Sequence, residues 1–158
     1  MTTPVQPIPA GYEGATPYII CRDAARAIDF YKQAFGASEI MRMPWHGGRI
    51  GHAELRISKA IVMLADEFPE MDIRSPQSIG GSPVSLLVYV EDVDALVKRA
   101  EAAGAKVIKP LADQFYGDRS CKLADPFGHL WMFATHKEDV SREEMDRRAA
   151  AMARQSSC

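Results

Sequence analysis

Three ionisable side chains alternate with apolar ones in the segment over residues 50–57, IGHAELRI. His52, Glu54 and Arg56 occupy every second position, and successive side chains of a β-strand point to opposite faces of its sheet. The alternation therefore predicts a half-buried strand with one polar face. A histidine beside a carboxylate on that face suits acid–base chemistry, because the carboxylate can hold the imidazole in one tautomer.

Three interpretations of this polar face stay open at the level of sequence. The first is ligand recognition. The second is catalysis, either by proton transfer or with a divalent metal held by His52 and Glu54 with help from other residues. The third is an ion-paired face of His52, Glu54 and Arg56 that lines a wet cavity and performs no chemistry.

Periodic apolar residues predict the elements that must hold this strand. In the first half of the chain, a helix over 24–35 begins after Asp23, a suitable capping residue, and ends before Gly36. In the second half, a helix that follows Asp92 ends at Gly104 in the same way. Strands are predicted over 15–22, 38–43, 50–57 and 60–66, and again over 83–90, 105–111, 120–124 and 129–135.

The two halves of the chain resemble each other. DAARAIDFYKQAFGAS and DVDALVKRAEAAGAKV share an Asp start, helical spacing of apolar residues and a Gly-Ala end. We therefore predict an α+β fold of two tandem β-α-β-β-β modules with curved sheets around a cavity, rather than a ferredoxin-like domain with long hairpins. The modules cover about residues 15–66 and 83–136 of one domain, 15–138, between a flexible arm (1–14) and a helical tail (139–158).

Composition excludes several classes of protein. The 158 residues carry 19 Lys and Arg against 21 Asp and Glu, which argues against a basic nucleic-acid binder. No apolar run approaches the roughly 18 residues of a membrane span, and the first residues do not read as a secretory signal. Cys21, Cys121 and Cys158 have spacings that fit reduced thiols. We expect a cytoplasmic protein that binds neither nucleic acid nor membrane.

The segment YGDRSCKLADPFGHLWMFATH, with the AIDFYKQAFGA helix and GHAELRI, resembles the vicinal oxygen chelate superfamily, the group of glyoxalases, bleomycin-resistance proteins and extradiol dioxygenases. Within it the sequence looks most similar to the PhnB-like branch, over about residues 15–138. The resemblance implies two modules whose curved sheets form an open cavity, and usually a homodimer. Enzymatic members hold a divalent metal on the concave faces, while the fold also hosts drug-sequestering proteins.

The resemblance also implies where such a metal would bind. It places the four ligand positions at Thr16, Glu54, Ser85 and Met132. Of these, Glu54 alone is a ligand of the expected kind, because hydroxyls bind zinc or nickel poorly and a thioether suits soft copper. We therefore expect no complete glyoxalase-type site and no cofactor. His52 and Glu54 are the candidates if a divalent metal does bind.

Further ligand-binding candidates follow from these positions. Tyr18 and Leu87 stand two residues after the first and third ligand positions, so they would share the cavity wall. Met132 would face the cavity while Trp131 packs beneath the helices. The opposite orientation of the last strand would instead let Trp131 stack on a planar ligand.

Arg119 is the remaining candidate. Its guanidinium could grip a ligand carboxylate or phosphate with two hydrogen bonds. Alternatively, Arg119 could fix the register of its strand by a bridge to Asp125 or Glu54.

Three functions are consistent with these observations. The first is a small-molecule-binding protein of the bleomycin-resistance kind that forms a homodimer. The second is a metal-dependent lyase or isomerase that uses Glu54 and His52. The third is a structural dimer with a vestigial cavity. For the first, the predicted ligand-binding residues are Tyr18, His52, Glu54, Arg56, Leu87, Arg119 and Met132.

Overall fold

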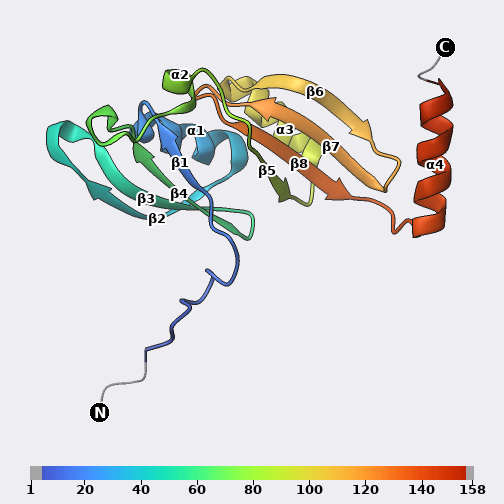
Figure 1. The fold of residues 1–158 in the computed structure, drawn as a ribbon, viewed down its shortest axis with the longest axis horizontal. Helices are drawn as coiled ribbons and strands as arrows, with labels where there is room; N and C mark the ends of the chain where they lie inside the picture. Colours follow the sequence, from blue (N-terminus) through green and yellow to red (C-terminus); the bar gives the residue numbers. More distant parts are fainter. Residues whose placement is uncertain (1–4, 156–158) are drawn as a thin grey trace. The chain divides into compact units, whose positions relative to one another are not determined.

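The computed structural model of the chain describes residues 5–155. The chain divides into two compact units, unit 1 (residues 1–81) and unit 2 (residues 82–158). Each unit has one four-stranded sheet, with the strand orders β1-β4-β3-β2 and β5-β8-β7-β6 (Figure 1). The predicted α+β fold with two tandem β-α-β-β-β modules is confirmed. Cys158 and the first four residues of the expected arm lie outside the described residues.

Unit 1 contains a parallel strand pair and two antiparallel pairs. β1 runs parallel to β4, and β3 pairs antiparallel with both β4 and β2. The segment 67–82, which joins the two modules, contains two short helices. The elements are β1 (Tyr18–Cys21), α1 (Ala24–Phe35), β2 (Ser38–Pro44), η1 (His46–Gly48), β3 (Ile50–Ile57), β4 (Ala60–Asp66), η2 (Pro69–Met71) and α2 (Pro76–Ile79).

Unit 2 repeats this arrangement and adds a tail helix. β5 runs parallel to β8, and β7 pairs antiparallel with β8 and β6. None of the described helices is both long enough and apolar enough to span a membrane. The elements are β5 (Ser85–Tyr89), α3 (Val93–Ala103), β6 (Lys106–Asp113), β7 (Asp118–Ala124), β8 (Leu130–His136) and α4 (Arg142–Gln155).

The same local signals begin and end α1 and α3. The Asp23 carboxylate accepts a hydrogen bond from the Arg26 backbone N–H at 3.0 Å, and the Asp92 carboxylate accepts one from the Ala95 N–H at 2.9 Å. Each helix ends at a glycine with positive φ, 69° at Gly36 and 109° for its counterpart in unit 2. The predicted starts and ends of both helices are confirmed.

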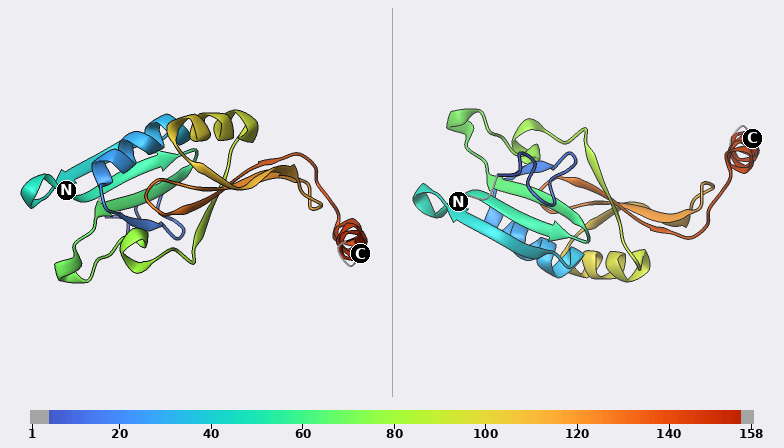
Figure 2. Two further views of the ribbon diagram at one scale, coloured as in Figure 1. Left: turned by 90° about the horizontal axis from the view of Figure 1, so that it is seen from above. Right: turned by 90° about the horizontal axis from the view of Figure 1, so that it is seen from below.

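One face of the unit 1 sheet is covered by α1. Ala53, Leu55 and Ile57 of β3 point to this side and are fully buried, as their alternation predicts. Figure 2 shows α1 lying along this face of the sheet. The opposite side, which we call the helix-free face of unit 1, receives the other residues of β3.

In unit 2, α3 covers one sheet face in the same way. Trp131 and Phe133 of β8 are fully buried on this side, with ring centroids 6.0 Å apart. The indole N–H of Trp131 donates to Asp125, whose other oxygen accepts from the Phe127 and His129 N–H groups at 2.9 Å each. The orientation of β8 with Trp131 beneath the helix is confirmed, and the alternative, with Trp131 on the opposite face of the sheet, is wrong.

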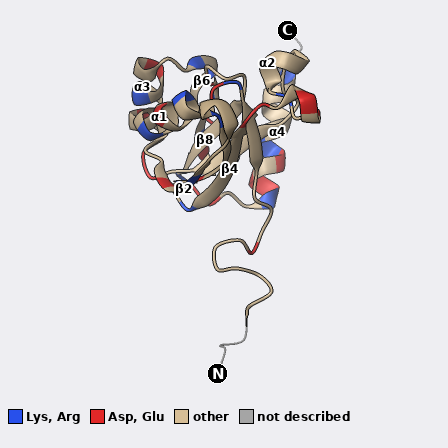
Figure 3. Cartoon of the chain, turned by 90° about the vertical axis from the view of Figure 1, so that its left-hand side faces the viewer, with Lys and Arg blue, Asp and Glu red and all other residues tan. Residues whose placement is uncertain are grey.

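The tail of unit 2 is fastened at the turn between β6 and β7. The Gly117 carbonyl accepts hydrogen bonds from the N–H groups of Lys137 and Glu138, at 2.9 and 3.0 Å. Gly117 has φ +99°, and a Cβ there would clash with the Glu138 carbonyl oxygen, so the position requires glycine. Arg148 of α4 forms an ion pair with Glu138 at 2.9 Å. Figure 3 shows that α4 carries residues of both charges.

We expect Leu55→Ala to lower the free energy of unfolding by about 2–5 kcal/mol, because it leaves a cavity beneath α1. Urea denaturation measures this change. Arg56→Ala, at the exposed neighbouring position, should change the same free energy by less than about 0.5 kcal/mol. Equal, small effects of the two substitutions would show that β3 does not present Leu55 to the core.

Candidate functional site

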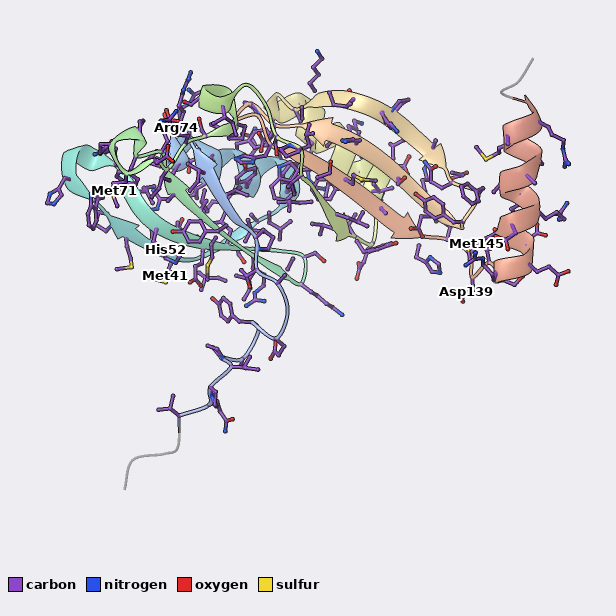
Figure 4. The ribbon with its side chains drawn as sticks, in the orientation of Figure 1. Met41, His52, Met71, Arg74, Asp139 and Met145 are labelled. Atoms are coloured by element: carbon purple, nitrogen blue, oxygen red, sulfur yellow. The ribbon has the colours of Figure 1, made fainter. Side chains whose placement is uncertain are left out.

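The polar residues of β3 lie on the helix-free face of unit 1. Glu54 is in register with Met63 of β4 and Met41 of β2, and Met63 is in register with Tyr18 of β1. A row of four side chains therefore crosses the sheet in the order Tyr18, Met63, Glu54, Met41. His52 stands two residues before Glu54, on the same face. Figure 4 shows His52 and Met41 on this part of unit 1.

A chain of hydrogen bonds joins the polar side chains of this face. The Tyr18 hydroxyl lies 2.7 Å from His52 Nδ1, and His52 Nε2 lies 3.1 Å from Glu54 Oε1. The hydroxyl of Tyr12 donates to Glu54 Oε2. With Glu54 ionised and His52 neutral, Nε2–H donates to the carboxylate and Nδ1 accepts the Tyr18 proton. We call Tyr12, Tyr18, His52 and Glu54 the Glu54 network.

The burial of the Glu54 carboxylate makes the hydrogen bonds of this network necessary. Glu54 is only 8% exposed, and a carboxylate removed from water is stable only where donors satisfy it. The hydroxyl of Tyr12, and then the imidazole of His52, lower the pKa of Glu54. The bond to Glu54 raises the pKa of Tyr12, and burial together with the Glu54 charge raises that of Tyr18. At neutral pH the network therefore holds one carboxylate anion and two protonated tyrosines.

Tyr12 is the member of this network that the sequence does not reveal. It belongs to the segment expected as a flexible arm, yet it reaches Glu54 across 42 positions of sequence. The neighbouring Gly11 lies against Ile61 of β4, where an added Cβ would be 3.2 Å from the Ile61 side chain. The single available signal is one aromatic residue in a stretch rich in proline and glycine, which does not indicate a partner.

Arg56 shares the helix-free face of unit 1 but is not part of the Glu54 network. Arg56 is exposed, so water reaches its charge. Apolar side chains surround the network instead. Tyr18 on β1 is 49% exposed, and Met41 and Met43 are exposed on β2, at the opposite edge of the sheet. The face thus combines an ordered polar centre with large apolar side chains that water reaches.

In unit 2, the structure brings together two of the predicted residues. Leu87 of β5 and Met132 of β8 are in register, on the face opposite α3, which we call the helix-free face of unit 2. Leu87 is exposed and Met132 is half-buried. They form an apolar pair of the kind expected for a ligand wall.

Arg119 lies on the other side of this sheet, which α3 covers. Its guanidinium donates twice to the Asp94 carboxylate of α3, at 2.7 Å each, and once to Asp113 at 3.2 Å. The predicted bridge to Asp125 or Glu54 is therefore wrong. The reason is strand parity: Arg119 alternates with Asp118, so it turns toward the helix that carries Asp94. These bonds occupy the guanidinium that was expected to grip a ligand.

The repeat within the structure shows which residue of unit 1 corresponds to Met132. Met132 lies on β8, in register with Leu87 of β5, and the same ladder position in unit 1 joins Met63 of β4 to Tyr18 of β1. Met63, not Glu54, is therefore the counterpart of Met132. Glu54 sits one strand further along the sheet, on β3.

The residues at these positions do not fit a glyoxalase-type metal. Thr16, Met63, Ser85 and Met132 supply two hydroxyls and two thioethers, which hold hard or borderline divalent ions poorly. Within residues 5–155, no group of three or more His, Cys, Asp or Glu side chains is placed to hold a metal ion. The carboxylate of Glu54 is already bonded to Tyr12 and His52.

Comparison with known proteins agrees with the fold. The model of the Glyoxalase/Bleomycin resistance protein/Dioxygenase superfamily matches residues 15–133. An uncharacterized protein of Mycobacterium tuberculosis is 44% identical over 143 residues, which cover 89% of this chain and 82% of that protein.

Solved structures show the same likeness. The crystal structure of TioX from Micromonospora sp. ML1 has a TM-score of 0.63 and 29% identity, covering 82% of this chain and 100% of TioX. A protein of Arabidopsis thaliana has a TM-score of 0.62 and 28% identity, covering 78% and 98% of the two chains. The fosfomycin resistance protein FosX of Listeria monocytogenes, solved with Mn(II) and sulfate, has a TM-score of 0.58 at 21% identity, covering 87% and 98%. At that identity FosX shows the fold alone.

We expect Tyr12→Phe to raise the pKa of Glu54 toward its ordinary value, because the Tyr12 hydroxyl is the main cause of its lowering. Carbon-detected NMR titration of the carboxyl group measures the shift. Tyr18→Phe is the control, since Tyr18 bonds to His52 and not to Glu54.

The same substitution should also change stability with pH. A carboxyl whose pKa is lowered by folding contributes stability above its unfolded-state pKa and loses it as pH falls through the lowered value. Tyr12→Phe should therefore lower the melting temperature at neutral pH and have little effect in strong acid. An equal effect at both pH values would show that the hydroxyl does not act on the ionised carboxylate.

Proposed function

Because the chain belongs to the glyoxalase/bleomycin resistance protein/dioxygenase superfamily, we propose that it binds a small molecule on the helix-free face of unit 1. Tyr18, His52 and Glu54 are the polar contacts of this proposed site, and Arg56 stands at its exposed end. In unit 2, Leu87 and Met132 form a second surface of the same kind. The proposed mode is binding without a glyoxalase-type metal.

The observation that carries this proposal is the Glu54 network itself. A buried carboxylate and its ordered donors lie on the sheet face that no α-helix of unit 1 covers among the described residues, beside exposed Tyr18 and Met41. Ligand sites combine a few fixed polar groups with aromatic and apolar walls. Methionine side chains adapt to irregular ligand shapes, and an exposed tyrosine ring offers a flat stacking surface.

The charges of the network restrict the ligand. Glu54 brings a negative charge, and its two donors come from the protein. The Tyr18 oxygen can still accept a hydrogen bond, because its proton goes to His52 Nδ1 when His52 is neutral. We therefore propose a ligand that is neutral or cationic at this face, with an apolar body and a hydrogen-bond donor directed at Tyr18.

The hydrogen bond between His52 Nε2 and Glu54 favours a second candidate, proton-transfer catalysis on the bound molecule. A carboxylate that holds one imidazole tautomer is the usual arrangement for a histidine base. In this candidate, Glu54 orients His52 and the Tyr18 hydroxyl exchanges its proton with Nδ1. Metal-dependent lyase or isomerase chemistry gains no such support, because the residues do not fit the metal.

Three finer assignments accompany the proposal. We propose a homodimer, because Ile40, Met43 and Trp45 leave the edge strand β2 and the residue after it with large exposed apolar side chains. Residues 15–138 would act as one domain of the PhnB-like branch. The cytoplasm is the proposed location, because the spacings of the three cysteines fit reduced thiols.

The proposed site is tested with Nile red, a neutral apolar dye. Met41→Glu should weaken dye binding about tenfold or more, because a charge placed on the apolar wall must be desolvated by the dye. Met71→Glu is the matched control, since Met71 is also exposed in unit 1 but lies on η2 (Figure 4). Fluorescence titration measures both. Equal loss in the two variants, or none in Met41→Glu, would reject this face as the site.

Metal analysis tests the proposed binding mode. Protein purified without chelator should contain well under one equivalent of nickel, zinc, manganese or iron, and should show no glyoxalase turnover, because its hydroxyl and thioether side chains bind these ions weakly. Plasma mass spectrometry and an assay with methylglyoxal and glutathione measure these. One equivalent of metal that is lost in His52→Gln and Glu54→Gln would establish the metal-dependent alternative instead.

A further inference from the structure

A second cluster of polar side chains lies in unit 2, where β5, β7 and β8 come together. The Tyr89 hydroxyl donates to Asp118 Oδ2 at 2.6 Å, and His136 Nδ1 lies 2.8 Å from Asp118 Oδ1. His136 Nε2 lies 2.9 Å from a carboxylate oxygen of Asp139. We call Tyr89, Asp118 and His136 the Asp118 cluster. The Glu54 network uses none of these residues.

The geometry fixes the protonation state of His136. Each ring nitrogen is within 3 Å of a carboxylate oxygen, and a carboxylate can only accept hydrogen bonds. Both nitrogens must therefore carry a proton, which makes His136 an imidazolium. A neutral ring would turn a lone pair toward one of the carboxylates. The bonds from Asp118 and then Asp139 raise the pKa of His136, in agreement with this geometry.

The two carboxylates differ in their role. Asp118 is 5% exposed and has two donors, so it is a fixed part of the fold that orients the ring through Nδ1. Asp139 is fully exposed and stands in the linker between β8 and α4 (Figure 4). The linker is fastened without Asp139, by the bonds of Gly117 to Lys137 and Glu138. The Asp139 carboxylate can therefore leave Nε2 while the tail stays in place.

One further cationic side chain, Lys122, lies on the same face as His136. His136 alternates with Met132 along β8, so both lie on the helix-free face of unit 2. Lys122 is in register with Met132 on that face, and it has no acidic partner among residues 5–155. Of the charged neighbours in the linker, Glu138 is paired with Arg148. The charge of Lys137 contributes, after the bonds from Arg119, to lowering the pKa of Asp94 on α3.

We propose that the Nε2 edge of His136 is a binding site for the carboxylate of a small organic acid, and that Asp139 occupies this site as an internal competitor. Asp118 and Tyr89 hold the imidazolium in position, and the apolar part of the acid lies toward Met132. This inference rests on the proposed function, since it assigns a ligand class to the second surface, the helix-free face of unit 2.

The test uses acetate as the probe and the full-length chain. The C–H signal of the His136 ring between its two nitrogens is followed by NMR while acetate is added, with chloride at the same ionic strength as the reference. Asp139→Ala should bind acetate about tenfold more tightly than the wild type, because a tethered competitor has an effective concentration in the millimolar range. Asp146→Ala, which removes an exposed carboxylate paired with Arg142 on α4, should bind like the wild type.

Two further measurements test whether the imidazolium of His136 is the group that binds acetate. Acetate binding to Asp139→Ala should disappear as pH rises through the pKa of His136, because the neutral ring has lost a donor. It should also disappear in the double variant Asp139→Ala, His136→Gln. An acetate response no greater than that to chloride, no gain in Asp139→Ala, or binding that persists without His136 would each overturn the proposal.

The outcome is separable from that of the proposed function. Asp139 is exposed, so Asp139→Ala should keep the melting temperature of the wild type, which confirms that the variant is folded. Nile red reports on Met41 in unit 1, whereas acetate reports on His136 in unit 2. Dye binding without acetate binding would refute only the carboxylate site, and acetate binding without dye binding would refute the assignment of unit 1.

Discussion

Each four-stranded sheet has one α-helix packed against it, and much of the structure depends on this constraint. A helix can bury only one side of a sheet, so the apolar set of the central strand β3 must point toward α1. β3 shows the consequence: Leu55 is fully buried beneath the helix, while Glu54 beside it must face the other way. A shift of one residue in register would place Glu54 under α1 without a donor. The fold and the polar face are therefore fixed together.

The helix-free faces bury carboxylates only where the chain supplies donors. Glu54 takes hydrogen bonds from Tyr12 and His52, and Asp118 takes them from Tyr89 and His136. In both clusters a histidine bonds to the buried acid, and an unpaired buried carboxylate would cost several kcal/mol. The difference lies at the far nitrogen of each ring. There His52 meets a tyrosine hydroxyl, which accepts or donates, whereas His136 meets a second carboxylate, which only accepts.

The elements and the sheet faces were predictable because local signals in the sequence determine them. The long-range contacts were not predictable. Asp23 and Gly36 act on neighbouring backbone, so the ends of α1 follow from a few adjacent residues. The alternation along β3 likewise identifies the polar face. The hydrogen bond from Tyr12 to Glu54 depends on the course of the N-terminal segment, which no periodicity in the sequence indicates. Arg119 binds Asp94 because α3 places Asp94 next to the sheet. That Met63 rather than Glu54 corresponds to Met132 was not predictable for a related reason, since strand order is a property of the folded sheet.

Each sheet is crossed by one row of side chains on its helix-free face, and comparing the two rows shows where the units differ. Tyr18, Met63, Glu54 and Met41 occupy the same ladder positions in unit 1 as Leu87, Met132, Lys122 and Lys109 in unit 2. The capping Asp and the terminal Gly of the helix are the same residue types in both units, because backbone geometry demands them. On the helix-free face, by contrast, a carboxylate in one unit corresponds to an ammonium group in the other. No packing requirement explains that inversion of charge, because the helix-free side of either sheet carries no helix that the side chain must fit. The proposed ligands would account for it, because the ligand proposed for the face of unit 1 is neutral or cationic, whereas the one proposed for the face of unit 2 carries a carboxylate.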